Sequence, residues 1–243
     1  MSADNQKPYT KDWAGWPSWS PEDTARRKRS IAELEARGVP YLAQLPIMLQ
    51  TEARLRTAEE IARRLLAMFG VCVYSEARNG GEGWEEAQKY LARIDTVLGG
   101  RLGDALTPRE KSFLAAETPD PGALATFGWR YECCHVLMWA LGFIAELGYP
   151  SDICDVSAMA KIIWAQDDLA GFLAAAKPHS GQEVIDMADL VFMYDWACVD
   201  ARVNGRPGPA GLNGEVTVEW HYAANWLIGA NNDADWDDIS PNT

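Results

Sequence analysis

Apolar residues recur at helical spacing along most of the chain, and no stretch of useful length alternates apolar and polar positions. In residues 57–78, for example, Ile61, Leu65, Met68 and Cys72 follow the spacing of one helix face. The other segments expected to be helical are 20–38, 84–100, 106–119, 182–203, 215–230 and shorter pieces between 155 and 176. No internal repeat is evident. The pattern predicts an all-α fold.

Residues typical of helix ends support these boundaries. Ser20 can cap a helix that has Pro21 in its first position, and Gly38 suits the C-terminal stop. The other predicted start signals are Thr57 with Glu60, Thr107 with Pro108 and Glu110, and Ser180.

The segment from about 124 to 148 is apolar nearly all round, which is typical of a helix surrounded by other helices. We therefore expect a single-domain multi-helix bundle, residues 21–243, built around this central helix. Its longest run without strongly polar side chains, Val136–Ala145, is far shorter than the roughly 20 residues needed to span a bilayer. We expect no membrane association.

Residues 1–20 form a proline-containing arm with Trp13, Trp16 and Trp19 at three-residue spacing. Two interpretations remain open. The rings pack on the protein's own body, or they bind a partner, since tryptophan is enriched at interfaces.

The 243 residues are 48% hydrophobic and 23% charged, which predicts a packed core. The net charge of −13 repels nucleic-acid phosphates and anionic membranes and favours a basic partner, although acidity also serves solubility alone. The five cysteines include no C-x-x-C pair, and the first twenty residues contain no apolar signal segment. These features predict a cytoplasmic protein with reduced thiols.

Two charged residues lie in the first turns of the central apolar segment. Arg130 and Glu132 point about 160° apart on a helix, so each needs a partner from another element. On residues 181–202, Asp186 and Asp189 share a face about 80° wide with Met193, Trp196 and Asp200. We expect Arg130 to pair with Asp186 or Asp189 in a structural ion network. The alternative is that these acids act as a general acid/base pair. The aromatic core is expected to contain Trp129, Trp139, Trp196 and Trp226.

Glu132 and His135 form a single E-x-x-H motif, whereas helical di-iron proteins need two copies and further glutamates. We expect no metal and no cofactor. Cys133 and Cys134 have no basic cluster beside them, which favours inert core thiols.

The C-terminal segment "NNDADWDD" resembles the start of a calcium loop but has Asp238 where the loop needs glycine. Its residues Asp233, Asp235, Trp236 and Asp237 are instead candidates, together with Trp13, Trp16 and Trp19, for binding a partner.

Nearly the whole chain, from about residue 24, resembles a bacterial family known as domain of unknown function 4272. The most specific matches are Trp129, Arg130, Glu132, Trp139, Gly142, Glu183, Asp186, Asp189, Trp196, Asn225, Trp226, Leu227, Trp236 and Asp237. The chain departs from the family's pattern at Tyr194, Asp195, Trp220 and Asn242. The resemblance implies a helical, single-domain, cytoplasmic protein and no particular activity.

Charge and the lack of a catalytic motif favour a non-enzymatic module that binds a basic protein, as an inhibitor or immunity protein does. The alternative is a hydrolase that uses Glu132 and His135 with Asp186 and Asp189 in a cleft between two helices. The oligomeric state is left open by the sequence.

Overall fold

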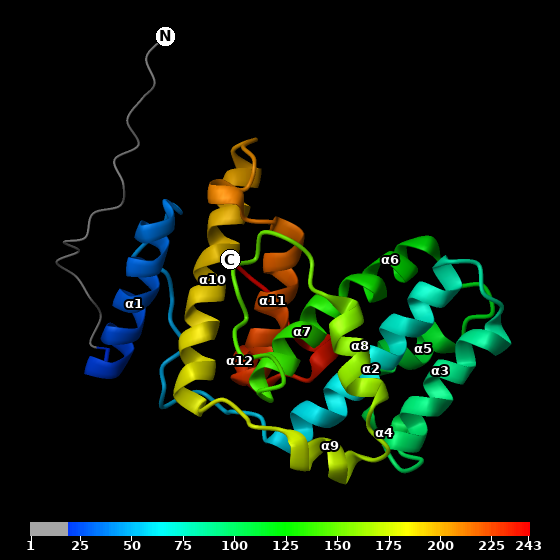
Figure 1. Cartoon of the computed structure of the whole chain (residues 1–243). Helices are drawn as coiled ribbons and strands as arrows, with labels where there is room; N and C mark the ends of the chain where they lie inside the picture. Colours follow the sequence, from blue (N-terminus) through cyan, green and yellow to red (C-terminus); the bar gives the residue numbers. More distant parts are fainter. Residues whose placement is uncertain (1–18) are drawn as a thin grey trace.

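A row of helices, each packed against the next, organises the chain (Figure 1). The computed structural model describes residues 19–243, which form helices and connecting turns without any strand. In spatial order the row is α1 (Pro21–Arg37), α10 (Gly181–Val203), α11 (Gly214–Leu227), α7 (Tyr131–Ala140), α2 (Ala58–Asn79) and α3 (Trp84–Val97). The prediction of an all-α, single-domain fold is confirmed.

Shorter helices complete the structure around this row. They are α4 (Leu102–Ala105), α5 (Pro108–Ala115), α6 (Pro121–Trp129), α8 (Val156–Trp164), α9 (Leu169–Ala175), α12 (Ala230–Asp233) and the 3-10 turns η1 (Pro209–Gly211) and η2 (Trp236–Asp238). Helices α6 and α9 pack against α2, and α12 packs against α11. Within residues 19–243, no helix combines the length and the apolar character needed to cross a bilayer.

The predicted helix starts are confirmed by their hydrogen bonds. The hydroxyl of Ser20 accepts from the backbone N–H of Asp23 at 3.0 Å, and Gly38 ends α1 with a left-handed φ of 71°. Complete capping boxes open three further helices: Thr57 with Glu60, Thr107 with Glu110, and Ser180 with Glu183. Each box satisfies N–H groups that the first helical turn leaves without a partner.

The single central helix expected at 124–148 is wrong. The segment forms two helices, α6 and α7, which meet at Arg130, and α7 ends at Ala140. Gly142 has a φ of 74°, and a Cβ atom there would collide with the carbonyl of Lys177. The carbonyls of Leu141 and Ala140 instead accept from the N–H groups of Lys177 and His179. The chain that leads into α10 therefore closes the end of α7.

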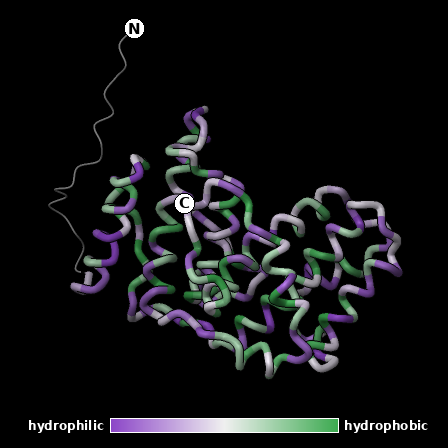
Figure 2. The backbone as a smooth tube through the Cα atoms, viewed as in Figure 1, coloured by the Kyte–Doolittle hydropathy of each residue, from purple (hydrophilic) through white to green (hydrophobic). Residues whose placement is uncertain are grey.

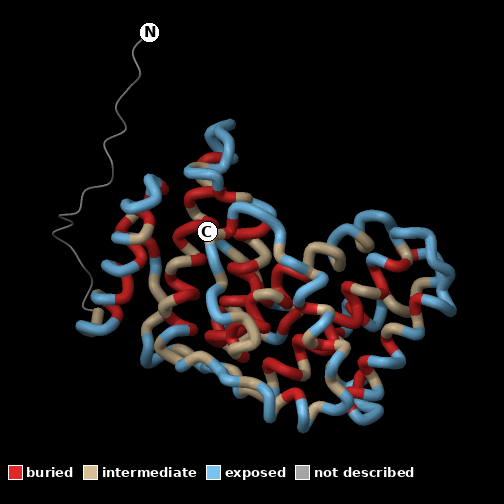
Figure 3. The backbone as a smooth tube through the Cα atoms, in the orientation of Figure 1, coloured by how far each residue is buried: buried red, intermediate tan, exposed pale blue. Residues whose placement is uncertain are grey.

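The central position is shared between α7 and α2. Every residue of α7 except His135 is buried, in agreement with its apolar pattern. Helix α2 contacts α3, α6, α7 and α9, and the side chains of Leu65, Leu66 and Phe69 in it are fully buried. Apolar and buried positions concentrate on the inner faces of these helices (Figures 2 and 3). The main core therefore lies between two helices rather than around one.

A smaller apolar cluster lies between α1 and α10, where Ile31 and Leu34 meet Met193 and Tyr194. Beside this cluster, Arg27 is 0% exposed, and its guanidinium donates to the Asp189 carboxylate at 2.8 Å. Ser30 also donates to Asp189, at 2.6 Å. The contact between α1 and α10 thus combines an apolar patch with a buried ion pair.

The four tryptophans expected in the aromatic core differ in position. Trp139 is buried and stacks on His179 with ring centroids 4.3 Å apart, and Trp226 is buried against Trp236 at 5.4 Å. Trp129 and Trp196 are half-buried at the edges of the two clusters.

Removing one member of the buried pair should destabilise the fold strongly. We expect Asp189→Asn to lower the free energy of unfolding by about 3–5 kcal/mol, because it leaves the Arg27 charge buried without a counter-charge. Urea unfolding followed by circular dichroism measures this change.

The exposed pair Arg29–Asp186, on the same two helices, provides the matched control. The Asp186→Asn variant should lose less than about 1 kcal/mol. Equal losses for the two variants would show that the buried pair does not hold α1 on α10.

Candidate functional site

Arg130 does not pair with Asp186 or Asp189, so this prediction is wrong. The Arg130 guanidinium instead donates to Glu219 on α11 at 2.8 Å. It also lies 3.9 Å above the ring centroid of Tyr222 on the same helix. Because α11 lies between α7 and α10, it supplies the acid that neutralises α7's arginine.

The acids on α10 pair with arginines of α1, on the side of α10 away from α11 (Figure 1). Asp189 binds Arg27, and Asp186 binds Arg29 at 2.7 Å. The face that carries these acids does pack against another helix, but that helix is α1 and not the expected α7. Helical spacing identifies a half-buried face without identifying the element that covers it.

Glu132 and His135 serve the packing of α7. The Glu132 carboxylate is 2% exposed and accepts from the N–H of Cys154 at 2.7 Å and from the indole N–H of Trp220 at 3.0 Å. His135 Nε2 lies 3.3 Å from the carbonyl oxygen of Leu147, and its ring stacks on Trp220 at 5.7 Å. Both side chains thus join α7 to neighbouring segments.

The four residues considered for hydrolysis do not line a common cavity. Glu132 borders a groove that includes neither Asp186 nor Asp189, whereas Asp189 borders a different cavity that includes neither Glu132 nor His135. Helix α11 packs between α7 and α10, the two helices between which the cleft was expected. The geometry gives the proposed acid/base pair no shared substrate position.

Cys133 and Cys134 are fully buried, as expected for core thiols. Burial raises the pKa of both thiols well above the usual range. The Cys133 thiol donates to the Glu219 carboxylate at 3.1 Å, next to Arg130. These thiols remain protonated and take part in packing.

The C-terminal acids proposed for partner binding are largely folded onto the body of the protein. Asp233 pairs with Arg54 and with Arg56, the latter at 2.9 Å. Trp236 is buried, and Asp237 accepts from the backbone N–H of Arg109 at 2.9 Å. These three residues thus contact the protein's own body, whereas Asp235 is exposed, and their role in binding a partner stays a prediction.

The N-terminal tryptophans are only partly covered by the structure. Trp19 is half-buried, and the guanidinium of Arg27 lies 5.4 Å from its ring centroid. Trp13 and Trp16 lie outside the described residues. For Trp19, this contact agrees with packing on the protein's own body.

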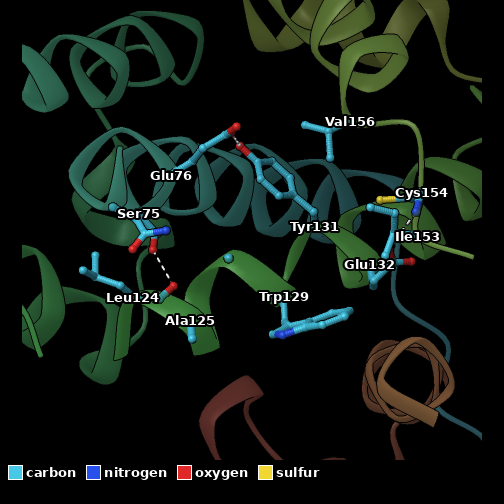
Figure 4. Close-up of a pocket in the computed structure, with 12 residues that line it drawn as sticks. Ser75, Glu76, Leu124, Ala125, Trp129, Tyr131, Glu132, Ile153, Cys154 and Val156 are labelled. Carbon is cyan, nitrogen blue, oxygen red and sulfur yellow. Dashed lines mark hydrogen bonds between the residues drawn. The ribbon is translucent and has the colours of Figure 1, made fainter. Parts of the chain in front are cut away.

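A groove of about 360 Å³ is lined by α2, α6, α7 and the segment that leads into α8 (Figure 4). We call it the Ile153 groove. Its apolar walls come from Leu124, Ala125, Trp129, Ile153 and Val156. Ile153 is 63% exposed, so it offers an apolar surface at the edge of the groove.

The lining contains two acidic residues, Glu76 and Glu132, and no Lys, Arg or His. Glu76 is exposed and accepts from the Tyr131 hydroxyl at 2.7 Å. Burial raises the pKa of Tyr131, so this phenol stays protonated and remains a donor. The groove therefore combines an apolar surface with negative charge.

A second cavity, of about 280 Å³, lies between α1, α10, α11 and the C-terminal segment. We call it the Arg26 cavity. His221 borders it, and its Nδ1 lies 2.9 Å from the buried Asp195 carboxylate. Asn225, one helical turn further along α11, contacts His221 Nε2 at 3.1 Å.

Sequence reasoning missed Arg27 and Asp195, which bind the lining residues Asp189 and His221 of this cavity. Arg27 lies four residues before Ile31 and seven before Leu34, so it falls on the apolar face of α1. This spacing could have indicated that Arg27 is buried. No comparable spacing links Asp195 to His221, because they lie on different helices. Among residues 19–243, no three His, Cys, Asp or Glu side chains are grouped so that they could hold a metal ion.

Fold and site together define an all-helical protein in which buried ion pairs such as Arg27–Asp189 and Arg64–Glu110 join different helices, and whose surface carries an apolar groove with acidic residues in its lining. The chain belongs to the family described as Domain of unknown function (DUF4272), whose family model matches residues 26–239. No curated protein and no solved structure matches the chain.

Acid should destabilise the protein partly through His135. Burial lowers the pKa of His135, so the folded state favours the neutral ring. Below the ordinary histidine pKa of about 6.5, the unfolded chain takes up a proton that the folded chain resists. The free energy of unfolding therefore decreases as the pH is lowered. We expect His135→Gln to lose less unfolding free energy than the wild type between about pH 7.5 and pH 5.5. Urea titrations at the two pH values measure this difference, and an equal loss in both proteins would contradict the assignment.

Proposed function

We propose that this protein is a non-enzymatic binding protein that receives a segment of a basic partner protein in the Ile153 groove. In this role it would resemble an inhibitor or an immunity protein, which occupies a surface of its target. The observation that carries the proposal is the lining of the groove, which is apolar and contains carboxylates but no Lys or Arg.

The apolar part of the groove favours an apolar anchor on the partner. Interfaces obtain most of their affinity from a few large side chains that are buried in fitted pockets. Trp129 and Ile153 offer such a surface from two different segments, α6 and the chain before α8 (Figure 4). One large apolar side chain of the partner, inserted between them, would be removed from water.

The charged part favours basic residues beside that anchor. Glu76 lies in the lining, and the exposed Asp152 and Asp155 flank Ile153 and Cys154 in sequence. The net charge of −13 adds attraction for a basic protein over roughly a Debye length, about 8 Å at physiological salt. We therefore expect the partner segment to carry Lys or Arg next to its apolar anchor.

The chemistry of the groove supports binding rather than catalysis. Both oxygens of the buried Glu132 carboxylate already accept hydrogen bonds. Burial raises the pKa of Cys154, and the neighbouring Glu132 raises it further, which leaves the thiol protonated and weakly nucleophilic. Neither group is prepared to attack a substrate or to remove a proton from one.

Replacing the exposed apolar residue should abolish capture of the partner. Immobilised full-length protein is incubated with lysate of its own cells, and the bound proteins are identified by mass spectrometry. We expect a basic protein on the wild type and roughly tenfold or greater weakening with Ile153→Glu, which places a charge where the apolar anchor binds. Val203→Glu, an equally drastic change at another exposed apolar residue, provides the control.

The charge contribution is tested separately with the purified partner. Glu76→Gln keeps an acceptor for the Tyr131 hydroxyl but removes the negative charge. It should weaken binding several-fold at low salt and less at high salt. Capture that is equally strong for Ile153→Glu, or that is insensitive to salt, would rule out the groove as the binding site.

A further inference from the structure

The Arg26 cavity lies apart from the Ile153 groove and shares no lining residue with it. Its walls are mainly apolar and include Ile47, Ile185, Phe192 and Ile228. Arg26 from α1 and His221 from α11 add polar groups to this lining. The cavity thus has the composition of a small-molecule site, an apolar space with a few fixed polar groups.

Arg26 is the unusual member of this lining. Its side chain is 1% exposed, and its Nη2 donates to the Asp23 carboxylate at 2.5 Å and to the Met48 carbonyl at 2.6 Å. Its Nε and Nη1 are buried and have no acceptor among residues 19–243. The neighbouring Arg27 uses all three of its nitrogens as donors. Because buried donors are nearly always paired, the free nitrogens of Arg26 indicate a missing acceptor.

The charges around the cavity decide what kind of acceptor fits. Asp23 already neutralises Arg26, and Arg27 neutralises Asp189. Asp195 beside His221 and the exposed Glu52 add further negative charge. An anionic ligand would add another negative charge to these, and a cationic ligand would face the free donors of Arg26. A neutral oxygen satisfies the donors without either cost.

The backbone at the cavity is built with unusual conformations. Gly229, Asn231, Asn232 and Asp233 all have φ values between 56° and 67°, a left-handed run that is rare outside glycine. This turn places the side-chain oxygen of Asn231 where it accepts a hydrogen bond from the backbone N–H of Ser240 at 3.2 Å. Such strain persists where the surrounding structure holds it, and it occurs often at ligand sites.

The C-terminal segment is held against the cavity from a second direction. Asn225 on α11 donates to the carbonyl of Ser240 at 3.2 Å. Asn225, Asn231 and Ser240 all belong to the lining. The last residues of the chain therefore form part of the wall, and their side-chain amides can report on what occupies the cavity.

We propose that the Arg26 cavity binds a small uncharged molecule that combines an apolar body with a carbonyl or amide oxygen. The oxygen accepts from the free nitrogens of Arg26, and the apolar body lies against Phe192 and Ile185. This site is independent of the proposed partner protein, and the failure of either proposal leaves the other standing.

Three probes of nearly equal shape and different charge test the ligand class: benzamide, benzoate and benzylamine. Each is titrated into the full-length, ¹⁵N-labelled protein, and the side-chain amide signals of Asn225 and Asn231 are followed. We expect saturable shifts with benzamide and roughly tenfold weaker binding of the two charged probes. Stronger binding of benzoate, or no shift with benzamide up to about 20 mM, would overturn the proposal.

The role of Arg26 is tested with Arg26→Lys. Lysine keeps the positive charge that Asp23 requires but lacks the free guanidinium donors. Benzamide should bind this variant roughly tenfold more weakly, whereas Arg29→Lys, an exposed position on the same helix, should bind it normally. Unchanged binding by a folded Arg26→Lys protein would contradict the proposal. If that variant does not fold, the ranking of the three probes on the wild type still decides it.

Discussion

The placement of α1 depends on the guanidinium of Arg27. This side chain is 0% exposed, and its nitrogens donate to Asp189 and to the carbonyls of Ala43, Leu45 and Pro46. A buried charge is costly when it lacks partners, because an isolated one loses its hydration without compensation. The same group therefore fixes three separate parts of the chain: α1, the segment that follows it, and α10. The wall of the Arg26 cavity exists because these parts are held together.

Ion pairs also join other helices of the fold. Arg64 on α2 binds Glu110 on α5 at 2.5 Å, and Arg130 at the start of α7 binds Glu219 on α11. Apolar faces attract one another without strong preference for position, whereas each of these pairs forms only at one mutual placement of its helices. The ionic contacts therefore select among packings that apolar contacts alone would leave close in free energy.

A feature could be predicted from the sequence when the residues that determine it lie close together along the chain. The helix starts depend on residues three positions apart, such as Ser180 and Glu183, and are readable locally. The end of α7 at Ala140 depends on contacts with Lys177 and His179, about forty residues away, and was missed. The half-buried acidic face of α10 was found, but its partner was not, since the spacing of Asp186 and Asp189 carries no information on which helix lies opposite.

The two candidate sites differ in whether their polar groups already have hydrogen-bond partners. In the Ile153 groove, the Glu132 carboxylate and the Tyr131 hydroxyl are both paired, so selection there depends on shape and net charge. In the Arg26 cavity, unpaired donors remain, so selection depends on hydrogen bonding, which is more discriminating. Arg26 also holds the carbonyl of Met48, two residues beyond the Pro46 carbonyl that Arg27 holds. A ligand that accepts hydrogen bonds from the free nitrogens of Arg26 would therefore stabilise the segment that holds α1 against α10. This segment lies at the end of the row of helices opposite α3.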